Sequence, residues 1–324
     1  MLPASGKVTM VTVTNTRRLE DRDIEPVLEL MRLSLGESSL LARTPALFQW
    51  KHLDNPFGRS IALVAEEDDR IVGLRTFMRW DLQIPDGGLL KCVRAVDTAT
   101  HPDYQRRGIF RRLTEEGVEI ASTEGIDLVF NTPNELSKPG YLKMGWQEVG
   151  RIGAMVRPSL ILLRPGPSSD STTAEEYLRE PIQVLDPRHG DRPARGARTP
   201  RSADYLQWRF TSHPTARYYL AEADGAAAIL RPNRRNGRSE LVLADMFGNP
   251  GKAIGAAVRA KRSAYLATWF SSGSPEKAAA IRHGFVPIPG YRALTLVMRP
   301  LGELPLNLTM MRGWDLAVSD LELL

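Results

Sequence analysis

The sequence predicts a mixed α/β protein made of two similar halves. Strand-like and helix-like apolar patterns alternate along the first half of the chain. Residues 47–56 and 205–214 share a Gln-Trp-basic sequence that ends at a proline, and each segment precedes a strand-like run. The 324 residues are enough for two domains, each with a core of its own. We therefore expect an internal duplication, with one copy in each half.

The apolar periodicity of the first half defines its elements. The segment at 45–53 is helical in pattern and stops at Pro56, and the extended run at 89–100 stops at the turn that contains Pro102. The segment at 108–123 has one apolar side that includes Leu113 and Ile120. In chain order we expect a strand at 8–13, helices at 23–35 and 45–53, strands at 61–65, 71–78 and 89–100, a helix at 108–123, a strand at 126–131, a helix at 136–144 and a strand at 147–156.

The second half contains counterparts of later landmarks as well. Met144-Gly145-Trp146 corresponds to His283-Gly284-Phe285, and each triplet ends a short helix and begins a strand. Turn-forming and small polar residues at 164–173 separate the two copies. We predict domains at 1–163 and 181–324, joined by a linker at 164–180.

The composition excludes several classes of protein. Hydrophobic residues make up 42% of the chain and charged residues 25%, which excludes a disordered, collagen-like or coiled-coil chain. No apolar run reaches the roughly 18 residues that a membrane span needs, and residues 1–8 contain no signal region, so we expect a cytoplasmic protein without a membrane partner. Cys92 is the only cysteine and no histidine pair has metal-ligand spacing, so no disulfide and no metal site are predicted.

The charge is moderately basic. Lys and Arg number 43 against 38 Asp and Glu, a net charge of +5 that is compatible with an anionic ligand. No nucleic-acid-binding motif is present, so we expect no nucleic-acid partner. The densest basic cluster is local and contains Arg106, Arg107, Arg111 and Arg112.

That cluster belongs to the most informative segment, residues 96–110. An extended run stops at a proline turn, passes through a basic loop that contains Gly108, and continues into a helix. The start of a helix offers unpaired N–H groups and a positive dipole end, and a glycine lets a ligand approach the backbone. The segment therefore predicts a pyrophosphate cradle. It has neither the spacing of an ATP-binding P-loop nor that of a dinucleotide fingerprint.

Two motifs in this half resemble those of one enzyme superfamily. Residues 105–110, QRRGIF, resemble the [QR]-x-x-G-x-[GA] acyl-CoA signature of the GNAT superfamily of N-acyltransferases, with Phe110 in place of the final small residue. Residues 134–146, NELSKPGYLKMGW, resemble the second part of that pattern, N-x-x-[AS]-x-x-x-Y-x-K-x-G-[FW]. The resemblance implies two tandem GNAT-like domains, each a mixed sheet flanked by helices, and acetyl-CoA as co-substrate.

The resemblance also implies roles for particular residues. The strand near residues 98–100 would be splayed from its neighbour so that its backbone can pair with pantetheine, and Tyr141 would be the general acid that protonates the departing thiolate. A core tyrosine with a satisfied hydroxyl is the alternative for Tyr141. Asp97 is the only acid near the position of the general base, although it could equally orient the acceptor or brace the strand. The expected acyl-CoA-binding residues are Thr98, Ala99, Thr100, Gln105, Arg106, Arg107, Gly108, Ile109, Phe110, Arg111, Asn134 and Ser137.

These features predict an N-acyltransferase that moves an acetyl group from acetyl-CoA to a primary amine of a small molecule. The alternative is an acyl-CoA-binding or scaffold module that has lost catalysis. In the second half, Ala280 takes the place of Tyr141, and no [QR]-x-x-G-x pattern follows the strand at 241–246. We therefore expect the second half to be a degenerate copy that shapes the acceptor pocket. The identity of the acceptor, the acyl length and the oligomeric state cannot be derived from the sequence.

Overall fold

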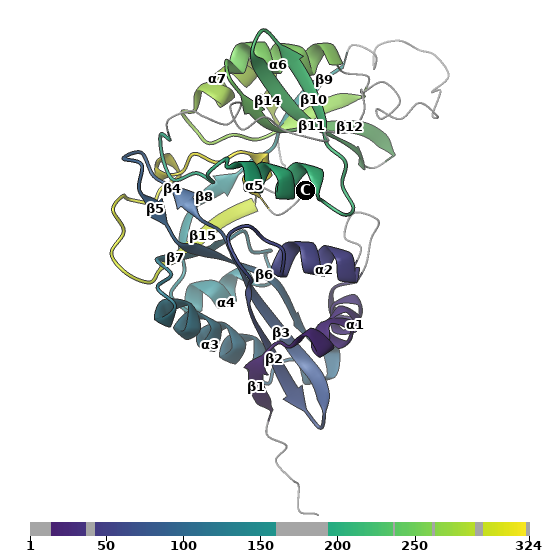
Figure 1. The fold of residues 1–324 in the computed structure, drawn as a ribbon, viewed down its shortest axis with the longest axis vertical. Helices are drawn as coiled ribbons and strands as arrows, with labels where there is room; N and C mark the ends of the chain where they lie inside the picture. The colour runs from purple at the N-terminus through teal and green to yellow at the C-terminus, as the bar shows by residue number, and fades with distance from the viewer. Residues whose placement is uncertain are drawn as a thin grey trace, which may run out of the picture.

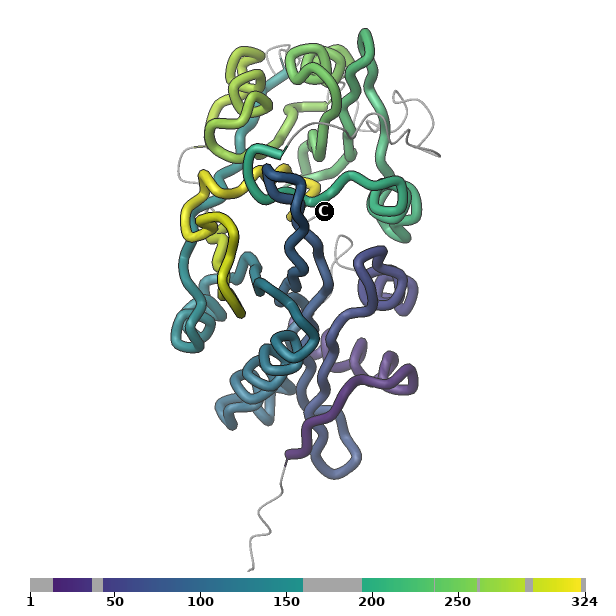
Figure 2. The backbone as a smooth tube through the Cα atoms, turned by 60° about the vertical axis from the view of Figure 1, so that its left-hand side comes forward, coloured from purple at the N-terminus to yellow at the C-terminus, as the bar shows by residue number. Residues whose placement is uncertain are grey.

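The computed structural model describes residues 14–36, 43–159, 194–235, 237–260, 263–288 and 294–321. They form two layered bodies, one above the other in Figure 1, each with a sheet and its own helices. The C-terminal segment lies between the two bodies, as the yellow trace in Figure 2 shows. Within the described ranges, no helix combines the length and the apolar character that a bilayer span requires. The mixed α/β class and the two-body architecture that the sequence predicts are confirmed.

The lower body is built on a mixed sheet of seven strands. Helices α1 (Ile24–Leu35) and α2 (Pro45–His52) pack on one face, where Phe48 contacts the same apolar cluster as Leu74. Helices α3 (Ile109–Thr123) and α4 (Lys138–Lys143) cover the other face. The strand order is β1 (Asn15–Arg18), β2 (Ile61–Glu67), β3 (Arg70–Arg79), β6 (Cys92–Thr100), β7 (Leu128–Asn131), β15 (Leu294–Pro300) and β8 (Gln147–Ile152).

The upper body repeats this plan with six strands. Helices α6 (Pro250–Ala260) and α7 (Pro275–Arg282) cover one face of its sheet. A short helix, α5 (Ala203–Leu206), continues into a π-helical turn at Gln207–Thr211, which corresponds to α2 in the duplicated sequence. The strand order is β10 (Tyr219–Ala223), β11 (Ala226–Arg235), β12 (Arg238–Phe247), β13 (Tyr265–Thr268), β9 (Met155–Pro158) and β14 (Val286–Pro287).

The two halves exchange their last strands. β9 follows β8 in the chain but pairs with β13 and β14 in the upper sheet, whereas β15 follows β14 but pairs with β7 and β8 in the lower sheet. Each exchanged strand also carries an arginine to the helix beside it. Arg299 of β15 donates to the carbonyl of Met144 at 2.9 Å, and Arg157 of β9 donates to the carbonyl of His283 at 2.7 Å. The sheets therefore do not correspond to two uninterrupted stretches of chain.

Several predicted elements differ in detail. The single strand expected at 89–100 is divided into β5 (Leu89–Leu90), which pairs with β4 (Leu82–Gln83) in a small hairpin, and β6. The strand expected at 147–156 is divided into β8 and β9. Apolar periodicity identifies extended segments, but the sheet in which a segment pairs depends on long-range contacts. The strand predicted at 8–13 and the linker predicted at 164–180 lie outside the described residues.

Candidate active site

The splay between β6 and β7 creates the opening of the site. These parallel strands pair only at Cys92–Arg94 with Leu128–Phe130, so the rest of β6 has no partner on that side. A bulge lies within this unpaired part, because Thr98 is opposite Arg75 of β3 whereas Val96 is opposite Thr76. Asp97 is the extra residue, and it adopts a positive φ of 34°. A bulge of this kind turns the strand and re-aims its side chains. The strand pairing confirms the splay that the resemblance implies.

The three residues expected to contact pantetheine lie beyond this bulge. Thr98 donates its hydroxyl to the carbonyl of Leu74 at 3.3 Å, Ala99 packs in the cluster beneath α1, and the carbonyl of Thr100 accepts the Ser34 hydroxyl at 3.1 Å. The side chains of Thr98 and Ala99 and the carbonyl group of Thr100 are thereby held against the sheet and α1. The edge of β6 that faces away from β3 is left for a ligand backbone.

The basic loop leads directly into α3. Gly108 precedes the helix with a φ of 77° and provides no side-chain cap, and Arg106 before it also has a positive φ, of 64°. The first N–H groups of a helix have no intrahelical partner, so without a capping side chain they point toward an external acceptor. A Cβ placed on Gly108 would meet nothing within 4 Å. The loop therefore offers an open, electropositive backbone cradle that fits a pyrophosphate.

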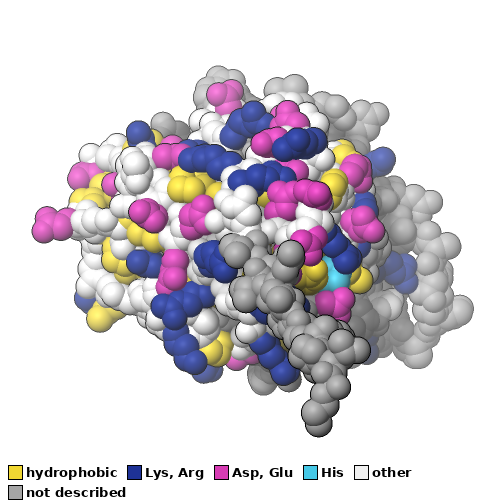
Figure 3. Space-filling model, turned by 90° about the horizontal axis from the view of Figure 1, so that it is seen from below, with side chains coloured by type: hydrophobic (Ala, Val, Ile, Leu, Met, Phe, Trp, Pro, Cys, Tyr) yellow, Lys and Arg dark blue, Asp and Glu magenta, His cyan; other side chains and the backbone are white. Residues whose placement is uncertain are grey.

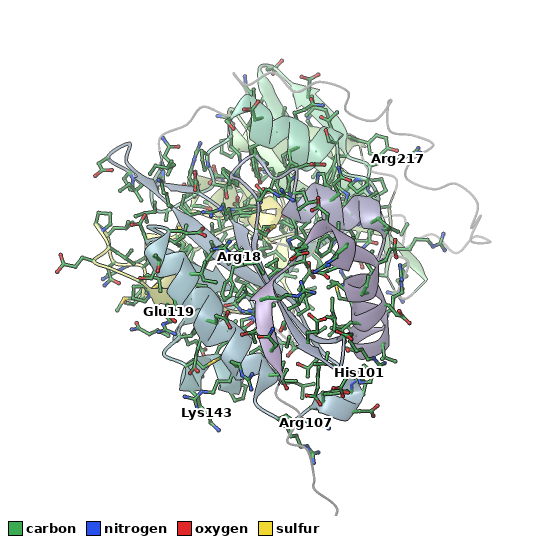
Figure 4. The ribbon with its side chains drawn as sticks, turned by 60° about the horizontal axis from the view of Figure 1, so that its bottom comes forward. Arg18, His101, Arg107, Glu119, Lys143 and Arg217 are labelled. Atoms are coloured by element: carbon green, nitrogen blue, oxygen red, sulfur yellow. The ribbon has the colours of Figure 1, made fainter. Side chains whose placement is uncertain are left out.

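The arginine side chains of the loop lie around this cradle. Arg107 reaches Glu67 at 3.3 Å and stacks on the Tyr104 ring at 4.5 Å, and Arg111 pairs with Glu115 along the helix. Figure 4 labels Arg107 and His101 at the lower end of the molecule. Seen from below, basic and acidic side chains are interspersed over this face (Figure 3). Because the Arg111–Glu115 pair is exposed and therefore weak, Arg111 stays available to an anion.

Asn134 and Ser137 form the turn that precedes α4. The Asn134 side-chain oxygen accepts both the backbone N–H and the hydroxyl of Ser137, each at 2.9 Å. Their polar groups are thus used locally to start the helix, a common role of asparagine. This turn places Tyr141 on the side of α4 that faces the sheet.

Tyr141 is buried, with 2% of its surface exposed. Its hydroxyl accepts a hydrogen bond of 2.6 Å from Nη1 of Arg75, and its ring packs edge-on against Phe110 at a centroid distance of 5.5 Å. Phe110 occupies the position where the acyl-CoA motif normally has a small residue. The substitution thus fills space between the start of α3 and Tyr141.

Asp97 faces the opposite side of the sheet and is held in ion pairs. It accepts from Lys51 at 2.7 Å and from His52 Nε2 at 2.9 Å, both on α2, and Arg43 lies 3.9 Å away. Burial alone would raise the pKa of Asp97, but the charge of Lys51 and the hydrogen bond from His52 outweigh it and hold the pKa well below its ordinary range.

The environment of His52 completes this cluster. Burial lowers the pKa of His52 despite the opposing effect of Asp97, so the ring is neutral at pH 7. Its other nitrogen lies 2.9 Å from the Ser60 hydroxyl. Both ring nitrogens are therefore engaged, and the cluster fixes α2 to the bulge of β6.

The sequence interpretation missed three residues that contact the predicted ones. Lys51 and His52 lie in the duplicated Gln-Trp segment, whose pattern indicates the repeat but not a contact with Asp97. Arg75 is the only charged residue in the apolar run at 71–78. A lone charge in such a run is the sequence feature that indicates a functional side chain there. Arg75 is the cross-strand neighbour of Thr98, the residue after Asp97. Arg75 on one face of the sheet and Asp97 on the other therefore both lie at the bulge of β6.

The upper body has neither an open loop before α6 nor a tyrosine at the position that corresponds to Tyr141. Asn249 precedes α6 and its side chain accepts the N–H of Lys252 at 3.1 Å, which caps the helix. A Cβ on Gly248 would lie 2.6 Å from the carbonyl oxygen of Gly225, so the loop is packed closed. Ala280 accepts from the Phe285 N–H at 3.0 Å, as Tyr141 accepts from Trp146 at 3.1 Å, which confirms that the two positions are equivalent.

Comparisons with known proteins agree with this geometry. Residues 15–149 match the family model described as an acetyltransferase (GNAT) domain. No curated protein sequence matches the chain. A GCN5-related N-acetyltransferase from Anabaena variabilis has a similar structure with a TM-score of 0.64 at 13% identity, over 90% of this chain and 73% of that one.

Two further solved structures are similar. A GCN5-related N-acetyltransferase from Kribbella flavida has a TM-score of 0.57 at 15% identity, over 89% of this chain and 71% of that one. A putative acetyltransferase from Pyrococcus horikoshii has a TM-score of 0.56 at 13% identity, over 91% of this chain and 92% of that one. At such identities the likeness concerns the fold, and it extends over both bodies. Residues 15–149 therefore match a GNAT acetyltransferase domain, a family that uses acetyl-CoA, and the chain shares the fold of GCN5-related N-acetyltransferases over about 90% of its length.

Proposed function

We propose that this protein transfers an acetyl group from acetyl-CoA to a primary amine of a small molecule. The observation that carries the proposal is the uncapped start of α3 at Gly108, open to an anion and adjacent to a splayed strand. The loop at 105–111 would hold the pyrophosphate through its N–H groups and arginines. The free edge of β6 at Thr98–Thr100 would pair with the pantetheine amides.

In this proposal, Tyr141 is the general acid. The neutral acceptor nitrogen attacks the thioester carbon and then loses one proton to water, the C–S bond breaks, and the Tyr141 hydroxyl gives its proton to the sulfur. Holding the amine and the thioester together removes much of the entropic cost of their encounter. Tyr141 is buried against Phe110, so little water would reach a sulfur bound beside its hydroxyl.

In this proposal, Asp97 is not the general base that takes the proton of the acceptor amine. A carboxylate with a strongly lowered pKa is a weak base, and Lys51 and His52 occupy one of its oxygens. The upper body also has an aspartate beside the bulge of its central strand: Asp245 follows the unpaired Ala244 of β12, and it pairs with Arg201 at 2.8 Å in a copy that lacks Tyr141 and the open loop. We assign Asp97 to fixing α2 against the bulge, which forms the acceptor side.

A small-molecule acceptor is favoured by the neighbourhood of α2. Trp50, next to Lys51, stacks on Trp208 of the upper body, so the second half walls the same side of the sheet. An enclosed acceptor side suits a discrete amine better than a protein tail. We propose that 181–324 forms a degenerate domain that shapes this side, and that the domain formed by 1–163 is completed by β15.

The alternative of a decayed acyl-CoA-binding module has one observation in its favour. Phe110 fills the space between the loop and Tyr141, and Tyr141 is almost inaccessible. Such a module would bind acetyl-CoA without releasing CoA when amines are added. Acceptor-dependent release of free thiol distinguishes the two functions.

The cradle is tested by calorimetric titration with acetyl-CoA of the wild type and two matched variants. Gly108→Asp and Gly125→Asp place the same residue at the two ends of α3, at φ values of 77° and 73°, and in both places a Cβ meets nothing within 4 Å. The backbone strain is therefore alike, and only Gly108→Asp puts a negative charge in the cradle. We expect Gly108→Asp to abolish binding and Gly125→Asp to keep it. Equal affinities in the two variants would refute the cradle.

A further inference from the structure

Arg75 is a buried cation with very few polar partners. Its exposed fraction is 0%, and the 2.6 Å bond from Nη1 to the Tyr141 hydroxyl is its one side-chain hydrogen bond within the described part of the chain. Nε and Nη2 are buried there without a hydrogen-bond partner. By contrast, Arg201, whose side chain is 8% exposed, contacts two aspartates at 2.8 Å each. Among the described residues, no carboxylate lies within ion-pair distance of Arg75.

The surroundings of Arg75 are aromatic. Its guanidinium lies 4.7 Å from the ring centre of Phe77, 5.2 Å from that of Tyr141 and 5.7 Å from that of Phe110. Ring faces stabilise a cation only partly, and burying a charge without a counter-ion is costly. A buried cation with two unused donors is therefore suited to a negative charge that arises nearby.

The hydrogen bond to Tyr141 has a directional consequence. A phenol oxygen that accepts from Arg75 retains its own proton for another acceptor. Arg75 belongs to β3 and is opposite Thr98, at the unpaired part of β6. The pair thus lies beside the opening through which the thioester arm would enter.

We propose that Arg75 is a positioning residue that acts through Tyr141 to favour the anionic form of the coenzyme A sulfur. This inference rests on the proposed function and extends it, because it identifies the group that balances the developing charge. As the C–S bond breaks, the sulfur takes the electron pair and is first an anion that accepts a hydrogen bond from the Tyr141 hydroxyl, and the Tyr141 proton then passes to it. The phenolate oxygen then accepts from Nη1 of Arg75 until it regains a proton from water. The amine attacks in its neutral form, and its nitrogen, which is positively charged after the attack, loses one proton to water.

The test needs no knowledge of the acceptor amine. Calorimetry compares the affinity of the full-length protein for CoA and for desulfo-CoA, which lacks the thiol, at pH values of about 7 and about 9, on either side of an ordinary thiol pKa near 8.5. A site that favours the sulfur anion binds CoA more tightly than desulfo-CoA, and more so at the higher pH. We expect a preference of about tenfold at the higher pH, the range of one hydrogen bond to a charged group.

Arg75→Met removes the charge and keeps the length of the side chain. Because replacing a buried ion by an apolar residue is often neutral or stabilising, we expect the variant to unfold thermally at or above the wild-type temperature. We expect it to lose the preference for CoA while its affinity for desulfo-CoA is unchanged. Tyr141→Phe should give the same loss, and it leaves Arg75 in place should Arg75→Met fail to fold.

Arg94→Met is the matched control. Arg94 is also a buried arginine between aromatic rings, at 4.9 Å from Trp80 and 5.3 Å from Phe130, but it donates to the carbonyl of Asp320 at 2.5 Å and not to Tyr141. We expect this variant to keep the preference for CoA.

Each outcome decides between the two proposals. A preference for CoA that persists in Arg75→Met, or a wild type that binds both ligands equally, overturns the role of Arg75 and leaves the CoA site standing. If the wild type binds neither ligand, the proposed function fails and the role of Arg75 fails with it.

Discussion

Trp50 and Trp208 donate their indole N–H groups to each other's backbone carbonyl oxygens, at 2.9 Å and 2.8 Å. Their rings stack with centroids 4.5 Å apart and an interplanar angle of 11°. The two residues occupy the same position in the duplicated Gln-Trp segment, so the contact is that of a pseudo-twofold axis between the halves. It joins α2, which carries the cluster around Asp97, to the upper body.

This reciprocal contact makes the interface sensitive to either tryptophan. Trp208→Ala removes a large ring that is 6% exposed, and we expect it to lower the free energy of unfolding by about 3–5 kcal/mol. Trp208→Phe keeps most of the apolar area and loses one hydrogen bond, so we expect about 1–2 kcal/mol. Urea unfolding measures both. Equal stability of the alanine variant and the wild type would contradict an energetic role of the contact.

The proposed acid gives a kinetic prediction. Tyr141→Phe removes the proton donor and keeps the ring between Phe110 and Trp146, so we expect turnover to fall by about 100-fold, with the affinity for acetyl-CoA largely retained. Release of free thiol in the presence of an amine measures turnover. Tyr265→Phe, in the upper sheet, is the control and should leave turnover unchanged. Wild-type turnover in Tyr141→Phe would remove the acid role.

Asp97 is expected to contribute to stability. Asp97→Asn leaves Lys51 and His52 without their carboxylate, and we expect a loss of about 3 kcal/mol near pH 7. Because the folded-state pKa of Asp97 is lowered, its contribution is fully present above the unfolded value near 3.9 and is lost as the pH falls below it. The difference between variant and wild type should therefore shrink at pH values below about 4.

Urea unfolding of Asp97→Asn and of the wild type, near pH 7 and below about pH 4, checks this prediction. Asp21→Asn is the control, because Asp21 is exposed and its pair with Arg59 lies at the surface, where we expect an effect under about 1 kcal/mol. A loss from Asp97→Asn no larger than that of the control would show that the cluster is not stabilising.

The exchanged strands predict that the halves depend on each other. A fragment of residues 1–163 lacks β15, so β7 and β8 lose the strand that lies between them. It also exposes β9, which pairs only in the upper sheet. We expect this fragment to aggregate or to unfold without cooperativity, and to recover when residues 164–324 are added. Circular dichroism and size-exclusion chromatography distinguish these outcomes. A monomeric fragment with a cooperative transition would contradict this dependence.

The sequence by itself determined the local elements, the duplication and the basic loop that leads into the helix at 108–123. These depend on short-range patterns: the helical period of 108–123, the glycine at 108 and the repeated Gln-Trp segment. The turn at Asn134 and the helix that carries Tyr141 are also local structures that the motif at 134–146 predicts, whereas the role of Tyr141 stays a prediction.

Only the tertiary structure decided which strands pair and which charges meet. β9 and β15 have no feature in their own sequences that assigns them to the opposite sheet, because pairing depends on partners far along the chain. The partners of Asp97 on α2 and the contact of Arg75 with Tyr141 join residues from different elements. The sequence places a charge at each of these positions, but burial and distance determine what that charge does, and both arise only when the chain folds.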